Sequence, residues 1–151
     1  MKLKHLEKLL ENLEGFSNPS PLLEQYRTPA PLAARLLFHA AMRGDIEGKR
    51  VCDLGCGTGV LGIGAALLGA RDVVAVEIDP DVIGIARKNA RQAAVEIHLI
   101  EAEVKYPQVL PLVGACDTVV MNPPFGAQQI HADRPFIDAA LAIAPVTYGI
   151  F

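Results

Sequence analysis

The stretch VCDLGCGTG at positions 51–59 constrains the fold more than any other part of this 151-residue chain. An apolar run ends in an aspartate, three alternating glycines follow, and a helical pattern begins at Val60. Glycine supplies the positive φ angles that a sharp turn needs, and it lets a backbone come close to a ligand. The stretch therefore predicts a buried strand that turns directly into a helix, with a ligand at the helix N-terminus.

Strand-like and helix-like patterns alternate along the rest of the chain. Strands are predicted at 49–54, 73–78, 95–100, 116–121 and 146–151, and helices at 3–16, 31–42, 60–68, 80–93 and 135–144. This alternation predicts an α/β fold with a largely parallel sheet, helices on both faces and a ligand at the carboxyl ends of the strands. We expect one domain, 1–151, with N-terminal helices at 1–43 and a core at 49–151. Thr28 and Asp133 are candidate helix N-caps.

The composition narrows the function classes. Hydrophobic residues make up 51% of the chain, yet no apolar run reaches the roughly 18 residues of a membrane span. The N-terminus lacks a signal-peptide core and the three cysteines resemble buried, reduced thiols, so we expect a cytoplasmic protein. The four histidines are scattered, and no metal site is predicted. A net charge of −3 is not typical of a strong independent nucleic-acid binder, so a nucleic-acid substrate would need local contacts or a partner.

Two nucleotide cofactors compete for the glycine turn. Gly57, Gly59 and Gly62 match a dinucleotide fingerprint, and Glu77 follows at the distance of a ribose-binding acid. A nicotinamide- or flavin-dependent oxidoreductase therefore stays open as an alternative. Asp53, ahead of the first glycine, favours S-adenosylmethionine, because the methionine part of that cofactor carries an ammonium group. The pyrophosphate of a dinucleotide is itself negative and would not be stabilised by a neighbouring carboxylate.

Acidic residues after the next two strands also favour S-adenosylmethionine. Glu77 and Ile78 end the strand at 73–78, where Glu77 can accept hydrogen bonds from both ribose hydroxyls. Glu103 follows the strand at 95–100, where it can accept from an adenine amino group, and we favour it over Glu101. The strand at 95–100 itself alternates apolar and polar residues, which is typical of a sheet edge.

The run Asn122-Pro123-Pro124-Phe125, after the strand at 116–121, predicts the reaction. Two prolines make a rigid, extended turn without N–H donors. The side-chain oxygen of Asn122 and the carbonyl of Pro123 can then both accept from one amino group, which localises the nitrogen lone pair for attack on a methyl sulfonium. Phe125 offers a ring on which a flipped or single-stranded base can stack. These four residues are the candidate catalytic residues of an amino N-methyltransferase.

The motifs resemble those of Rossmann-like S-adenosylmethionine-dependent amino methyltransferases. More narrowly, the chain resembles the methyltransferase-like-five family, adenine N6-methyltransferases of small-subunit ribosomal RNA. The matching stretches are LEQYRT at 23–28, DIE at 45–47, positions 53–64 and MNPPFG at 121–126. The resemblance implies that Gln25 and Thr28 close over the cofactor and that Tyr26 lies near the methyl-transfer site. The complete set expected around the cofactor is Gln25, Tyr26, Thr28, Asp53, Gly55, Gly57, Thr58, Gly59, Val60, Glu77, Ile78 and Glu103.

The sequence also departs from the family pattern. Members usually carry Asp where this chain has Glu77 and Glu103. The sheet of the superfamily normally has seven strands, and the fifth predicted strand here is the last. We therefore expect a Rossmann-like methyltransferase fold truncated at its C-terminus after strand five. Such a form would keep its cofactor contacts and be impaired in catalysis or RNA binding, or would shield the open edge by self-association.

Two other enzymes share the Asn-Pro-Pro run. A protein glutamine N5-methyltransferase commonly has Tyr in place of Phe125 and lacks the signature of Gln25 to Thr28. A DNA adenine N6-methyltransferase is hardly separated from an RNA enzyme by these residues. Intact Asp53 and Asn122 argue against a non-catalytic nucleotide-binding module. The resemblance further implies a small zinc-binding activator protein, which would add a strand beside 95–100.

Overall fold

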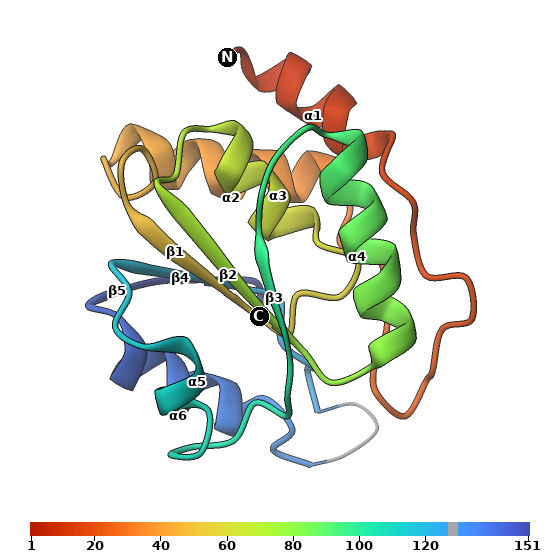
Figure 1. Cartoon of the computed structure of the whole chain (residues 1–151), viewed down its shortest axis with the longest axis vertical. Helices are drawn as coiled ribbons and strands as arrows, with labels where there is room; N and C mark the ends of the chain where they lie inside the picture. The colour runs from red at the N-terminus through yellow and green to blue at the C-terminus, as the bar shows by residue number, and fades with distance from the viewer. Residues whose placement is uncertain (127–129) are drawn as a thin grey trace.

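The computed structural model describes residues 1–126 and 130–151, with a parallel sheet at its centre (Figure 1). The strands are β1 (Arg50–Leu54), β2 (Asp72–Glu77), β3 (His98–Glu101), β4 (Thr118–Met121) and β5 (Val146–Gly149). They lie in the order β3-β2-β1-β4-β5, and every neighbouring pair is parallel. The order reverses between β2 and β4, so the carboxyl ends of β1 and its neighbours form the switch point where open α/β sheets bind ligands. The predicted α/β fold is confirmed.

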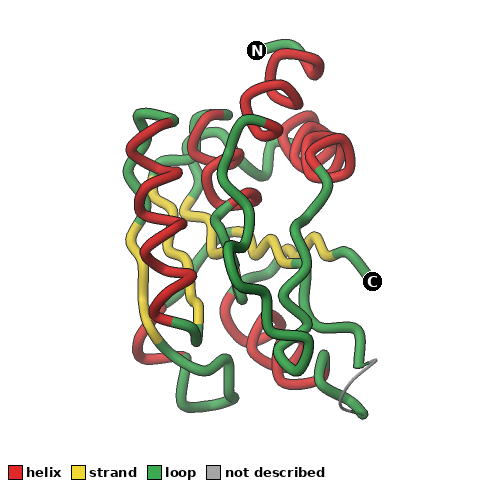
Figure 2. Tube along the Cα trace, turned by 90° about the vertical axis from the view of Figure 1, so that its right-hand side faces the viewer, coloured by secondary structure: helices red, strands yellow, loops and turns green. Residues whose placement is uncertain are grey.

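Helices cover both faces of the sheet (Figures 1 and 2). One face carries α1 (Leu3–Glu11), α2 (Ala30–Met42), α3 (Val60–Leu67) and α4 (Pro80–Gln92), and the other carries α5 (Leu110–Val113) and α6 (Arg134–Ile143). Alternate residues of β1 therefore enter two apolar cores. Val51 packs in the core with α1, α2 and α3, whereas Cys52 and Leu54 pack with α5 and α6. Burial on both faces explains why this strand has a nearly continuous apolar sequence.

Most predicted elements have their expected bounds to within two residues, but α1 ends early. The prediction extends the helix to residue 16, whereas the structure ends it at Glu11. Beyond that point Glu14 bonds to α4, because the Asn89 amide donates to its carbonyl and accepts from its N–H. The same amide donates to the carbonyl of Thr58, so α4 joins the N-terminal segment to the glycine turn.

The strand β3 begins at His98 rather than at residue 95, since the N–H of Val95 still bonds to the carbonyl of Ala90 at the end of α4. Its predicted position at a sheet edge is confirmed. The short helix α5 is not expected from the sequence, because four residues are too few to show a helical apolar repeat. In the described part of the chain, each helix is too short or too polar to span a bilayer.

The predicted cap at Thr28 is wrong, and the one at Asp133 is right in position only. Pro29, not Thr28, immediately precedes α2, and the Thr28 hydroxyl contacts Asn122 instead. Asp133 does precede α6, but among the described residues its side chain makes no capping hydrogen bond. Its backbone is already helical, with φ −77° and ψ −22°, whereas a capping residue is usually extended.

Candidate functional site

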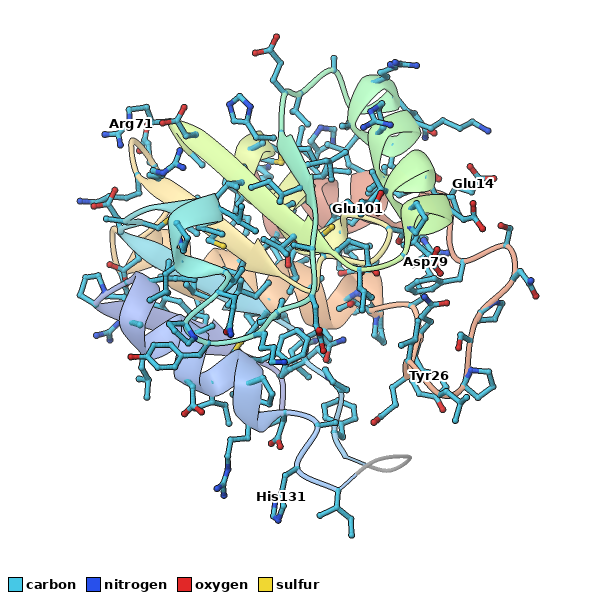
Figure 3. All side chains as sticks on the ribbon, turned by 60° about the horizontal axis from the view of Figure 1, so that its bottom comes forward. Glu14, Tyr26, Arg71, Asp79, Glu101 and His131 are labelled. Atoms are coloured by element: carbon cyan, nitrogen blue, oxygen red, sulfur yellow. The ribbon has the colours of Figure 1, made fainter. Side chains whose placement is uncertain are left out.

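A cavity of about 290 Å³ opens at the carboxyl ends of β1, β2 and β4. The strand ends line it together with residues from the segment 22–28, before α2, and from the segment 130–136. Figure 3 brings this side of the molecule forward and labels Tyr26 and His131, one from each of these segments. The glycine turn and the Asn-Pro-Pro run, which are far apart in the sequence, thus meet at one cavity.

Most of the predicted site residues line this cavity. They are Gln25, Tyr26, Thr28, Asp53, Gly55, Gly57, Thr58, Val60, Glu77, Ile78, Glu103, Asn122 and Pro124. Three others do not: Gly59 is the N-cap of α3, Pro123 is buried, and Phe125 is 55% exposed. Of the two acidic candidates after β3, Glu103 lines the cavity and Glu101 does not.

The glycine turn is closely enclosed by two aromatic rings. Gly55 and Gly57 have φ angles of 69° and 55°, a region that favours glycine. A Cβ atom on Gly55 would lie 2.7 Å from the ring of Phe136, and one on Gly57 would lie 3.0 Å from the ring of Phe16. Both rings line the cavity. Sequence reasoning missed them as site residues, because their place depends on the packing of distant segments.

Asp53 lines the cavity, and one of its carboxylate oxygens has no hydrogen-bond partner in the described part of the chain. The residue is 1% exposed, and its Oδ2 accepts from the N–H of Gly62 at 2.8 Å. Its Oδ1 is buried and has no hydrogen-bond partner among the described residues. Burial is the main cause that raises the pKa of Asp53 to about 7, and the nearby charge of Glu77 acts in the same direction. A cationic ligand group would supply the missing partner.

Glu77 links the glycine turn to the end of β2. Its Oε1 accepts from the N–H of Gly57 at 3.0 Å, and its Oε2 accepts from the N–H of Asp79 at 2.9 Å. The residue is 7% exposed, and burial raises the pKa of its carboxyl. Each oxygen keeps one acceptor position beyond these bonds. Glu77 therefore holds the turn in addition to any ligand contact, a role that spacing alone does not reveal.

Gln25 is buried and joins the segment before α2 to the start of α4. Its Nε2 donates to Oδ2 of Asp79 at 3.0 Å, and this bond lowers the pKa of the Asp79 carboxyl. Its Oε1 accepts from the N–H of Ser20 at 2.8 Å. Both ends of the Gln25 amide are therefore engaged within the protein, so the residue holds its segment against the cavity.

Asn122 is held in one orientation by Thr28. Its Nδ2 donates to the hydroxyl oxygen of Thr28 at 3.0 Å. Its Oδ1 is buried and, among the described residues, accepts no hydrogen bond. This oxygen is therefore available to a donor in the cavity. A neutral amide NH₂ group is a suitable donor, because it can donate a hydrogen bond to Oδ1 of Asn122 without bringing a charge into the site.

A metal centre is not apparent in the described residues, which contain no group of three or more His, Cys, Asp or Glu side chains suited to hold an ion. The three cysteines are buried and free, and Cys56 of the glycine turn lines the cavity. Burial raises the pKa of the Cys56 thiol well above its ordinary value, so this side chain remains a protonated, weakly polar group.

Known proteins resemble this chain over most of its length. Residues 32–144 match the family model of the methyltransferase small domain. The rRNA N(6)-adenosine-methyltransferase Mettl5 of Drosophila melanogaster is 42% identical over 95% of this chain and 69% of its own length. The corresponding enzyme of Danio rerio is 40% identical over 95% and 70%. The crystal structure of a candidate RNA methyltransferase from Pyrococcus horikoshii superimposes with a TM-score of 0.91 at 44% identity, over 99% of this chain and 71% of that one.

Proposed function

Because this chain belongs to the methyltransferase-like-five family of rRNA N6-adenosine methyltransferases, we propose that it methylates N6 of an adenine in small-subunit ribosomal RNA. The observation that carries the proposal is a pair of buried oxygens without partners among the described residues, Oδ1 of Asp53 and Oδ1 of Asn122. Both residues line one cavity. One oxygen belongs to a carboxylate and suits an ammonium group, and the other belongs to an amide and suits a neutral amine.

The cofactor is S-adenosylmethionine, which supplies an electrophilic methyl group. Asp53 is assigned to its ammonium group, Glu77 to its ribose and Glu103 to its adenine. The positive φ angles at Gly55 and Gly57 let the backbone approach it closely. Burial and the raised pKa of Asp53 support this assignment, since a cation restores the charged form that the apolar surroundings disfavour. Gln25, Tyr26, Thr28, Thr58, Val60 and Ile78 complete the walls of the cavity.

Asn122 and the prolines act on the amine. The adenine amino group donates to Oδ1 of Asn122 and to the carbonyl of Pro123, which draws the nitrogen toward tetrahedral geometry and localises its lone pair. Pro123 and Pro124 have no N–H to compete with the amine as donors. A strong general base is unnecessary, because the N–H becomes acidic only after the nitrogen has gained the methyl group. Phe125, exposed beside the cavity, is available to stack on the base.

A protein partner is part of the proposal. We place a small zinc-binding activator at the edge strand β3, where it would add a strand. A groove of about 500 Å³ runs beside this edge and is lined by Arg87, Ala90, Arg91, Val95, Glu96, Ile97, His98 and Leu99. Unpaired backbone groups at such an edge favour addition of another strand. We place the complex in the cytoplasm.

Radiolabelled methyl transfer tests the proposal. Protein with and without the activator is incubated with separate rRNA, DNA and protein fractions, comparing the wild type with Asn122→Ala. We expect label in rRNA that falls by about a hundredfold or more in the variant, as for loss of a group that stabilises the transition state. Asn18→Ala, an exposed asparagine outside the cavity, is the control. Label in DNA or protein alone would replace the rRNA assignment with one of the two enzymes that share the motif.

A further inference from the structure

The segment 24–28 contacts the Asn122–Gly126 loop at a second place, beyond the bond between Thr28 and Asn122. Glu24 Oε1 accepts from the N–H of Phe125 at 3.0 Å. Its Oε2 accepts from the N–H of Gly126 at 3.2 Å. One carboxylate thus receives two consecutive backbone donors from a loop about one hundred residues further along the chain, 101 and 102 positions away.

The N–H groups of Phe125 and Gly126 are the first backbone donors that follow the two prolines. Pro123 and Pro124 lack N–H groups, so the N–H of Phe125 is the first backbone donor after Asn122. A carboxylate is the strongest side-chain acceptor for such a group. In the described part of the loop, the Glu24 carboxylate accepts from both of these donors, and the Thr28 hydroxyl holds the Asn122 side chain before the prolines.

Glu24 adopts a backbone conformation that is unfavourable by itself. Its φ of 49° lies in the left-handed region, which costs free energy for any residue with a Cβ atom. Backbone bonds surround it, from its own N–H to the carbonyl of Pro21 and from the N–H of Tyr26 to its carbonyl. The strained conformation carries the side chain to the loop, and the next residue, Gln25, turns toward Asp79 on the cofactor side.

We propose that Glu24 is a positioning residue for methyl transfer. By holding the N–H groups of Phe125 and Gly126, it fixes the turn that aims the Asn122 oxygen and the Pro123 carbonyl at the target amine. Glu24 also lines the cavity, but both of its oxygens accept from loop N–H groups, so in this proposal it acts through the loop rather than on the reacting atoms. This proposal rests on the proposed function, because the shape of the loop matters for methyl transfer only if the loop binds an amine.

The test compares Glu24→Gln with Glu24→Asp and with Glu47→Gln, which removes one exposed negative charge at the opposite end of the sheet. Glu24→Gln replaces one acceptor oxygen with a donor, so one loop N–H loses its partner. We expect kcat for RNA methylation to fall about tenfold or more. The Kd of S-adenosylmethionine should stay within about twofold, and Glu24→Asp should keep part of kcat. Glu47→Gln should behave as the wild type.

The KM for RNA separates positioning from a charge effect. Removing a negative charge beside an anionic substrate strengthens RNA association by itself, so the KM should stay constant or fall while kcat falls. A raised KM, or a weakened cofactor, would assign Glu24 to direct ligand contact and overturn the proposal. An unchanged kcat would overturn it as well.

Amide hydrogen exchange of the free protein makes the test independent of activity. In Glu24→Gln, exchange at Phe125 and Gly126 should speed up by about tenfold or more, and amides of β1 should not change. If wild-type protein methylates none of the fractions, the proposed function fails. Hydrogen exchange at the Phe125 and Gly126 amides then still decides whether Glu24 holds the loop. Unchanged exchange in Glu24→Gln would show that it does not.

Discussion

At the scale of single residues, Asp53 lowers the stability of the free protein at neutral pH. Its pKa is raised from 3.8 to about 7 by burial, so the folded state binds a proton more tightly than the unfolded state does. The stabilising effect of that proton is complete below about pH 4 and is lost as the pH rises through 7. Asp53→Asn should remove this pH-dependent loss of stability, because the amide side chain does not ionise.

We therefore expect the free energy of unfolding of Asp53→Asn to exceed that of the wild type at pH 8 by an amount on the order of 2–4 kcal/mol. The difference should narrow toward pH 5. If Asp53 binds the cofactor ammonium as proposed, cofactor affinity should fall by about tenfold or more, because that cation loses its charged partner. Urea unfolding at both pH values and calorimetric titration of the cofactor measure the two effects. Asp138→Asn, on the exposed face of α6, should change neither.

Substitutions at Thr28 distinguish its two proposed roles, in binding the cofactor and in positioning Asn122 for the amine. Thr28→Val removes the acceptor for Asn122 Nδ2 at nearly constant volume, so the amide is free to rotate. We expect kcat to fall about tenfold or more, and Thr28→Ser, which keeps the hydroxyl, to restore most of it. Steady-state kinetics and cofactor titration provide the measurement. A weakened cofactor with an intact kcat would restrict Thr28 to closing over the cofactor.

At the scale of elements, local patterns predict strands and helices well but predict their contacts poorly. The strand, glycine turn and helix at 50–67 follow from adjacent residues, and so does the start of α4 at Pro80. The end of α1 could not be predicted from adjacent residues, because the backbone of Glu14 bonds to Asn89, which lies 75 positions further along the chain. Glu24 is missed for the same physical reason: its partners come from the far end of the chain, and its own neighbours give no sign of them.

Two helix glycines test how closely the elements are packed. A Cβ atom on Gly64 of α3 would clash with Cδ1 of Leu37 in α2, a fully buried side chain that would have to shift within the core. Gly64→Ala should therefore destabilise the fold by about 1–3 kcal/mol. Gly84 of α4 has no atom within 4 Å of its Cβ position, so Gly84→Ala should stabilise it by about 0.5–1 kcal/mol. Thermal melts distinguish the two, and equal effects would contradict the described packing.

At the scale of the whole molecule, charge limits how the chain meets RNA. The net charge is −3, from 14 basic and 17 acidic residues. We therefore expect the chain alone to bind RNA weakly, with a shallow slope of log affinity against log salt that corresponds to few phosphate contacts. Fluorescence anisotropy between about 50 and 200 mM salt measures this slope. A steep slope for the chain alone would mean that a local basic surface outweighs the net charge.

The hydrogen bonds that join Glu24 to Phe125 and Thr28 to Asn122 also bear on how the molecule folds. They connect positions 101 and 94 residues apart, and closing loops of that length is entropically unfavourable until the intervening chain is ordered. We therefore expect the sheet to assemble before the Asn122–Gly126 loop reaches its native shape. During refolding, helical signal should therefore return before catalytic activity. During gradual denaturation we expect activity to be lost before most of the secondary structure.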